Sequence, residues 1–284
     1  MLRLGVRAAA VGWLVAWWIW LIGFQHTFVE VDGQAYWGLD LDALYRGVRL
    51  GDQDAFLYSP PVALLFLPFS LLPYDVFYAL FAAINLGALV YLLGWELAAL
   101  SLFVLPVSNE IARANMHLLI GVPIVVGFRH PTAWAWVVLT KVTPGIGLLW
   151  FAVRREWRAL GVGLAATAAI TVATFLVVPD LWFRWFDVLL GSANEVRPNA
   201  VTQIPVLPRV GIAAVLVVIA ALRDRPALVV VACMIALPAI WVNSLAMLVA
   251  VVPLLRRPPG RGTPDELPIE GGGSSPRLTR DIPA

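Results

Sequence analysis

A long uncharged run near the start of the chain decides its fold class: residues 8–29 read AAAVGWLVAWWIWLIGFQHTFV and follow Arg3 and Arg7. This run is longer than the apolar core of a secretory signal peptide, and it lacks a small-residue cleavage site. About 20 apolar residues suffice for a helix to cross the hydrocarbon core of a bilayer. We therefore expect a retained first transmembrane helix over Ala8–Phe24, with its N-terminus in the cytoplasm.

The rest of the chain has the same character. Of its 284 residues, 61% are hydrophobic and only 13% are charged, and the mean hydropathy is +0.83. Such a composition predicts an all-α polytopic membrane protein. The single cysteine, Cys233, lies in an apolar run, which excludes an intrachain disulfide and argues against a thiol site. Nothing in the sequence suggests nucleic-acid binding.

Uncharged runs, oriented by the preference of Lys and Arg for the cytoplasmic side, predict about ten spans. Pro60–Pro73 contains four prolines, so we expect an interfacial or re-entrant segment there. Residues 226–255 are too many for one span and too few for two of full length, so we expect a tight hairpin that turns near Pro238–Asn243. The other expected spans are Val76–Trp95, Leu97–Ser108, Asn115–Phe128, Thr132–Thr140, Gly145–Val153, Ala159–Val178 and Val210–Leu222.

This topology makes residues 1–257 one integral membrane domain with both termini in the cytoplasm and an external first loop at residues 25–59. Thirteen basic residues then lie inside and seven outside. Residues 258–284 are rich in Pro, Gly and Ser and lack apolar periodicity, so we expect a disordered cytoplasmic tail.

The external first loop concentrates acidic residues. Leu41, Leu44, Tyr45 and Val48 fall on one helical face with Trp37, which predicts an amphipathic helix on the membrane surface. Six of the 18 acidic residues of the chain lie in this loop, namely Glu30, Asp32, Asp40, Asp42, Asp52 and Asp54.

Asp32 directly follows the first span and has two interpretations. It is either a general base at an interfacial cleft, or the N-cap of a helix that starts at Gln34, since aspartate is a favoured cap. Asp40, Asp42, Asp52 and Asp54 are interpreted as solvated surface charges.

Lys141 is the only lysine and precedes the helix-breaking Thr143-Pro144. A lysine at a broken helix near the interface suits a phosphate, although it could also extend along the surface to reach water. Arg113 could supply a second cation or form an ion pair with Glu110 one turn away. His117 could bind substrate or relay a proton, or could serve only the fold. Together with Tyr36, Tyr58, Asn115, Arg197 and Asn243, these residues cluster on the external face of the predicted topology.

Other chemistries find little support in the sequence. Three scattered histidines and one apolar cysteine do not form a zinc site. The chain has no phosphate-binding loop of the Walker type, no Gly-rich dinucleotide motif and no calcium-loop pattern. A transporter would more often show internal repeats or charges at mid-span. We expect neither a cofactor nor a metal.

Several short motifs, taken in their order along the chain, resemble glycosyltransferase family 87 of the GT-C superfold, whose members are polyprenyl-phosphate-mannose-dependent α-mannosyltransferase-like proteins. These motifs are Asp32-x-x-x-Tyr36, Phe56-x-Tyr58-x-Pro60-Pro61, Asn115 in the place of a Gly-Gln-x-Asn motif, Lys141-x-x-Pro144, Arg154-Arg155-x-Trp157-Arg158 and Pro238-x-x-Trp241. The resemblance covers residues 5–257.

The resemblance implies a GT-C-like bundle and an inverting hexosyltransferase of the cell envelope. The donor would be a polyprenyl-phosphate sugar, with mannose as the default, and the acceptor a lipid or glycan on the external face. On the matching motifs Asp32 would be the catalytic base and Lys141 would contact the donor phosphate. From their position on the predicted external face, we expect Arg113 and Arg197 to be further cations for that phosphate. Tyr36, Tyr58, Asn115, His117 and Asn243 would bind substrate. An inactive lipid-binding or scaffolding relative is the alternative, and a permease or flippase is a weaker one.

Overall fold

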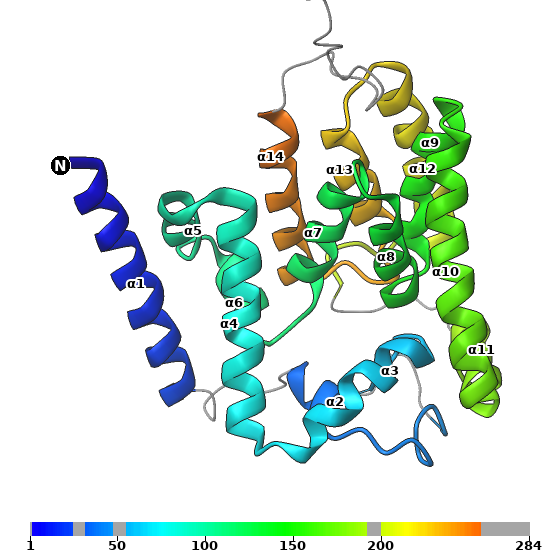
Figure 1. Cartoon of the computed structure of the whole chain (residues 1–284), viewed down its shortest axis with the longest axis horizontal. Coiled ribbons are helices and arrows are strands. Elements are labelled where there is room, and N and C mark those ends of the chain that lie inside the picture. Colours follow the sequence, from blue (N-terminus) through cyan, green and yellow to red (C-terminus); the bar gives the residue numbers. More distant parts are fainter. Residues whose placement is uncertain (1, 25–31, 48–54, 192–199, 257–284) are drawn as a thin grey trace, which may run out of the picture.

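Every regular element is a helix in the part of the chain that the computed structural model describes, residues 2–24, 32–47, 55–191 and 200–256 (Figure 1). Within these ranges, three helices are long and apolar enough to cross a membrane: α1 (Leu2–Phe24), α4 (Tyr74–Leu93) and α10 (Trp157–Val177). They agree with the first, second and seventh spans expected from the sequence. Only one residue of α10, Gly163, is buried, as expected for a helix that faces lipid. The molecule is therefore a helical membrane-type protein.

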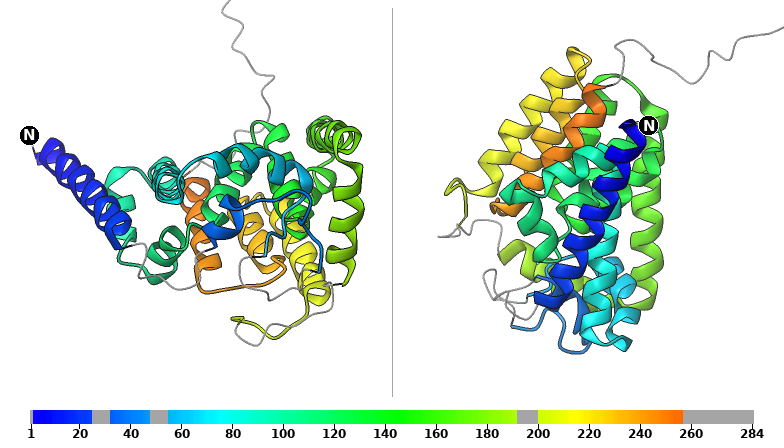
Figure 2. Two further views of the ribbon diagram at one scale, coloured as in Figure 1. Left: turned by 90° about the horizontal axis from the view of Figure 1, so that it is seen from below. Right: turned by 90° about the vertical axis from the view of Figure 1, so that its left-hand side faces the viewer.

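The ends of α4 illustrate how the sequence sets a helix. Pro73 stands at the N-cap, and Asp75 places a negative charge in the first turn, where the helix dipole favours it. Gly94 follows the last turn with a φ of 81°, a left-handed conformation that glycine adopts without steric cost and that ends the helix. α1 lies at one edge of the bundle, where it contacts α4 and the helix after it (Figure 2).

The expected span Leu97–Ser108 is not one continuous helix. The segment consists of two helices, α5 (Trp95–Ser101) and α6 (Leu105–Ala112), which are bent by 90° relative to each other. Pro106 lies in the first turn of α6, where its missing N–H costs nothing, whereas a continuous helix would lose a hydrogen bond at this position. Even when the bent pair counts as one span, the described helices provide at most four candidate spans.

Shorter apolar helices occupy the positions of most other expected spans and fill the middle of the bundle between α4 and α10 (Figure 1). Each has fewer residues than the roughly 20 that a perpendicular span requires. They are α7 (His117–Gly127), η3 (Pro131–Ala133) with α8 (Trp134–Thr140), η4 (Thr143–Leu148) with α9 (Leu149–Val153), and α12 (Val206–Leu222).

The hairpin expected within residues 226–255 is confirmed. α13 (Ala227–Ile235) ends before the predicted turn, and the chain returns as η5 (Asn243–Ala250) and α14 (Val251–Leu255), both of which contact α13. Arg209 on α12 is 5% exposed and fixes the turn. Its guanidinium donates hydrogen bonds to the carbonyls of Ile204, Ile235, Leu237 and Pro238 at 2.6–3.0 Å.

We expect Arg209→Met to destabilise the fold by about 2–4 kcal/mol, because each buried acceptor left without a donor costs about 1–3 kcal/mol. Thermal unfolding of the detergent-solubilised protein, followed by circular dichroism, measures the effect. Arg158→Met, at an exposed position of α10, is the matched control. Equal melting temperatures of the two variants would contradict a structural role for Arg209.

The amphipathic surface helix expected in the first loop is wrong. Among the described residues of the loop, 32–47 and 55–59, only α2 (Gly33–Trp37) is helical, and residues 41–47 form turns in which Leu44 and Tyr45 are buried. Tyr45 has a φ of 67°, which a helix cannot accommodate, and its hydroxyl donates to the carbonyl of Tyr58. Asp40 and Asp42 are exposed, as expected, whereas Asp52 and Asp54 lie outside the described residues.

A helix that the sequence analysis did not predict holds this loop in place. In α11 (Pro179–Gly191), Arg184 donates hydrogen bonds from Nη1 to the carbonyls of Leu41, Asp42 and Leu44 at 3.2–3.3 Å. Trp185 donates to the carbonyl of Leu57 at 3.2 Å. The loop continues into α3 (Pro60–Phe66) and η2 (Leu67–Leu71), twelve residues in all and too short to cross a bilayer.

Candidate functional site

The polar residues of the predicted site gather around the connection between α6 and α7, residues 113–116. Ala114 has a φ of 51°, so the connection turns sharply in a conformation that residues other than glycine rarely adopt. α2 reaches it through Gly33, whose N–H donates to the carbonyl of Arg113 at 3.2 Å. η5 packs against both α6 and α7, and α2 and α3 lie below α7 and α8 in Figure 1. Segments distant in sequence thus meet at one end of the bundle.

Asp32 binds this connection directly. Its Oδ2 accepts a hydrogen bond from Asn115 Nδ2 at 2.7 Å and forms an ion pair with Arg113 Nε at 3.1 Å. The carboxylate remains 35% exposed, and among the described residues Oδ1 receives no hydrogen bond. Asp32 occupies the N-cap position of α2, as the alternative interpretation expected, but its side chain makes no capping hydrogen bond to the helix. Asp32 is therefore an oriented and partly exposed carboxylate.

Tyr36 and Tyr58 form a buried pair beside Asp32. Their hydroxyl oxygens are 3.0 Å apart. Burial raises the pKa of both phenols well above the usual value, and the charges of Asp32 and Glu110 raise it further, so both remain protonated. Since both carboxylates act on both phenols, the two tyrosines lie near Asp32 and near the second polar group described below.

Glu110 and His117 form the second polar group, and both are completely buried. Glu110 Oε2 and His117 Nδ1 are 2.9 Å apart, and Glu110 Oε1 accepts a hydrogen bond from the backbone N–H of His117. Asn243 Nδ2 donates to Glu110 Oε2 at 3.0 Å. The expected ion pair between Glu110 and Arg113 is therefore wrong, since each has a different partner.

Lys141 completes the cluster. α8 ends at Thr140, and the extended backbone of Lys141 (φ −143°, ψ 113°) directs the chain into η4. Lys141 Nζ lies 3.0 Å from His117 Nε2 and 5.9 Å from the ring centroid of Tyr58. The interpretation of Lys141 as a lysine that only extends to water is wrong, because it contacts buried groups. Arg197, the third expected phosphate-binding residue, lies outside the described residues.

The comparison with known families adds an independent observation to this geometry. The family model described as glycosyltransferase family 87 matches residues 56–264. The chain belongs to glycosyltransferase family 87. It is thus a membrane glycosyltransferase, and the family resemblance of its motifs is confirmed. No curated protein and no solved structure gives a significant match. The matched range contains Tyr58, Lys141 and the residues from Glu110 to His117, whereas Asp32 and Tyr36 precede it.

Two residues of the polar cluster were not candidates in the sequence analysis. Glu110 was considered only as a partner of Arg113, and Ser244, whose Oγ is 3.1 Å from His117 Nε2, was not considered. An acidic residue in the apolar helix Leu105–Ala112 was the available signal for Glu110, because a buried carboxylate requires partners. Ser244 carried no comparable signal.

The described part of the transferase contains no group of three His, Cys, Asp or Glu side chains arranged to hold a metal ion. The charged groups of the polar cluster are two carboxylates and two cations. Asp32 pairs with Arg113, and Glu110 is connected to Lys141 through His117. One carboxylate is partly exposed and the other fully buried. The exposed carboxylate can take a proton from a substrate, and the cations can stabilise a departing anion.

Proposed function

We propose that this transferase moves a sugar, mannose by the family resemblance, from a polyprenyl-phosphate donor to a lipid or glycan acceptor on the external face of the cell membrane. The observation that carries the proposal is Asp32 Oδ2 held by Arg113 and Asn115, with Lys141 in the same polar cluster. The proposal includes a GT-C-like arrangement of about ten membrane segments, with both termini in the cytoplasm, residues 1–257 as the membrane domain and residues 258–284 as a tail.

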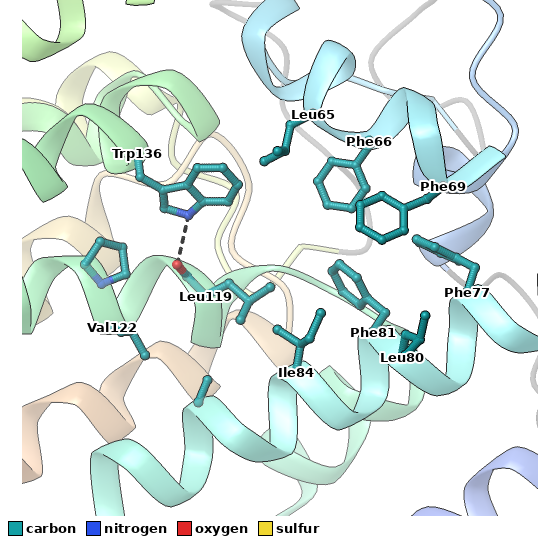
Figure 3. A pocket seen from close by; sticks show the side chains of 12 residues that line it. Leu65, Phe66, Phe69, Phe77, Leu80, Phe81, Ile84, Leu119, Val122 and Trp136 are labelled. Atoms are coloured by element: carbon teal, nitrogen blue, oxygen red, sulfur yellow. Dashed lines mark hydrogen bonds between the residues drawn. The ribbon is translucent and has the colours of Figure 1, made fainter. Parts of the chain in front are cut away.

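An apolar pocket of about 380 Å³ beside the polar cluster supports a donor with an isoprenoid tail (Figure 3). It lies between the α3–η2 segment, α4, α7 and α8. The ring of Tyr36 packs 5.5 Å from that of Phe66 and 5.7 Å from that of Phe81, and both phenylalanines line the pocket. One end of the pocket therefore lies against the polar cluster. This arrangement suits a ligand whose phosphate lies among the charges while its hydrocarbon chain occupies the pocket.

In the proposed reaction the acceptor hydroxyl oxygen attacks the anomeric carbon of the donor sugar. The bond from that carbon to the phosphate oxygen breaks, and its electron pair leaves with the polyprenyl phosphate. Asp32 Oδ1 takes the hydroxyl proton, while Arg113 and Asn115 hold Oδ2 and so orient the carboxylate. A single displacement inverts the anomeric centre, so a β-linked donor gives an α-linked product.

The departing phosphate gains one negative charge as the bond breaks. Lys141, Arg113 and Arg197 are the cations proposed to stabilise this charge, which explains why the leaving group needs no acid. Substrate binding by Tyr36, Tyr58, Asn115, His117 and Asn243 stays a prediction. In the structure Tyr36 and Tyr58 hydrogen-bond each other, Asn115 donates to Asp32, and His117 and Asn243 donate to Glu110.

A transfer assay tests the proposal. The protein, reconstituted in nanodiscs, is offered a panel of polyprenyl-phosphate sugars with an acceptor extract from membranes, and a nucleotide sugar serves as the alternative donor. We expect sugar transfer from a lipid-linked donor and none from the nucleotide sugar. The reverse preference would contradict the proposal. Tight binding of the lipid donor without turnover would favour the inactive lipid-binding alternative.

The pocket permits a second test, on the length of the donor chain. Ile84 lines the pocket, and Ile84→Trp should fill part of it. We expect the variant to raise the KM for a long-chain donor about tenfold and to leave a donor with two isoprene units unaffected. Ile170→Trp, at an exposed position on α10, is the control for adding a tryptophan to a lipid-facing helix. An equal effect on both donors would show that the isoprenoid chain does not occupy the pocket.

A further inference from the structure

His117 is held between two groups whose hydrogen-bonding roles are fixed. On one side an ionised glutamate can only accept, and Glu110 Oε2 faces His117 Nδ1 at 2.9 Å. On the other side a lysine ammonium can only donate, and Lys141 Nζ faces Nε2 at 3.0 Å. With Glu110 as a carboxylate and Lys141 as an ammonium, this arrangement requires the imidazole proton on Nδ1 and leaves the Nε2 lone pair to Lys141. A neutral imidazole in this tautomer satisfies both neighbours.

Glu110 is anchored so firmly that it determines this orientation. Its carboxylate is completely buried and accepts hydrogen bonds from the backbone N–H of His117, from His117 Nδ1 and from Asn243 Nδ2. Because two of these three bonds come from His117, both the ring and the start of α7 are tied to the same carboxylate. Loss of the negative charge would remove the reason for the proton to stay on Nδ1.

Ser244 offers Nε2 a second donor. Its Oγ lies 3.1 Å from Nε2 and also accepts a hydrogen bond from the backbone N–H of Trp241 at 3.0 Å. Nε2 has one lone pair in the ring plane, so Lys141 and Ser244 compete for it. When Lys141 turns toward an anion, the Ser244 hydroxyl can take its place, and the buried nitrogen does not lose its hydrogen bond.

We propose that Glu110 is a positioning residue for Lys141: it fixes His117 as the Nδ1–H tautomer, so that Nε2 holds the Lys141 ammonium ready for a lipid phosphate and Ser244 replaces it when the phosphate binds. The proposal rests on the role of Lys141 in the proposed function. Glu110 itself does not touch the substrate, since it acts through His117.

The tautomer is tested on the wild-type protein, independently of activity. In ¹⁵N NMR of the histidine-labelled protein, with the His117 signals assigned by their loss in His117→Asn, we expect Nδ1 to carry the proton. A proton on Nε2 would overturn the proposal. This measurement remains decisive even if a substitution at the fully buried Glu110 prevents folding.

Kinetics test the positioning role. We expect Glu110→Gln to raise the KM for a polyprenyl-phosphate sugar about tenfold, with a smaller change in kcat. Glu96→Gln is the control: Glu96 pairs with Arg7 outside the polar cluster, so neither kinetic constant should change. In a Lys141→Ala background Glu110→Gln should add little, because both substitutions remove the same contact. The proposal would be overturned if the effects of Glu110→Gln and Lys141→Ala on the donor KM were additive in the double variant. It would also be overturned if Glu110→Gln changed the KM no more than Glu96→Gln does.

Ser244 provides a milder variant. Ser244→Ala should raise the donor KM severalfold, because His117 Nε2 would then lose its hydrogen bond when Lys141 turns toward the phosphate. Ser244→Thr keeps the hydroxyl and should have a donor KM close to that of the wild type. A donor KM of Ser244→Thr as high as that of Ser244→Ala would contradict the replacement of Lys141 by Ser244 at His117 Nε2. If the wild-type protein uses no lipid-linked donor, the proposed function fails and this role falls with it. If the wild-type enzyme is active and these variants match it, only the present proposal fails.

Discussion

Asp32→Asn is expected to lower the rate of sugar transfer by about 10²–10⁴-fold, the usual contribution of a general base. Asparagine is nearly isosteric with aspartate, and its side-chain oxygen can still accept from Arg113 and Asn115, so the fold and the approach of α2 to Arg113 should persist. The amide cannot take a proton from the acceptor hydroxyl. The loss should therefore appear in kcat, with the donor KM changed little.

Initial rates with a polyprenyl-phosphate sugar measure this effect. Asp42→Asn is the matched control, because Asp42 lies in the same loop, is exposed and has no proposed role, and it should retain the wild-type rate. A melting temperature close to that of the wild type shows that Asp32→Asn is folded. Full activity of Asp32→Asn would rule out Asp32 as the base and leave the family assignment untouched.

The long helices could be predicted because their signal is local. α1, α4 and α10 are uninterrupted apolar runs, and a bilayer imposes one length on all such runs. The right angle between α5 and α6 carried only one local signal, Pro106, within a run that otherwise looked continuous. Length and hydropathy alone could not distinguish a broken helix from a short span.

The first loop shows what such signals cannot predict. Its apolar residues fit a surface helix by spacing, yet Tyr45 and Leu44 are buried because of contacts far along the chain. Arg184 reaches the loop carbonyls from more than 130 residues away, and Tyr45 donates to the carbonyl of Tyr58. Periodicity describes which side chains share a face. It does not reveal whether lipid or protein covers that face.

The sequence predicted most residues of the site, but it did not predict which of them pair with each other. Asp32, Arg113, Asn115 and Lys141 stand out as polar residues near apolar runs, and the structure brings them into one cluster. The pairing of Glu110 with His117 was missed because Arg113, one turn away, looked like the natural partner. Local ion pairs compete with tertiary ones, and in a buried site the partner that also satisfies backbone groups prevails.

Lys141→Ala is expected to weaken binding of the lipid phosphate about 10–100-fold, because a hydrogen bond to a charged group contributes about 1.5–3 kcal/mol. His117 Nε2 should keep Ser244 as a donor, so the buried pair with Glu110 should survive the substitution. The donor carries one negative charge on its phosphodiester, whereas the product phosphate carries more. The loss of affinity should therefore be greater for the product.

Inhibition by a polyprenyl monophosphate, compared with the donor KM, measures this difference. Arg129→Ala removes an exposed cation after α7 and is the matched control, for which we expect no change in either value. Equal affinity of Lys141→Ala and the wild type for the monophosphate would refute the phosphate contact. A greater loss for the monophosphate than for the donor would place Lys141 beside the phosphate oxygen on which charge develops as the glycosidic bond breaks, where it stabilises the transition state more than the bound donor.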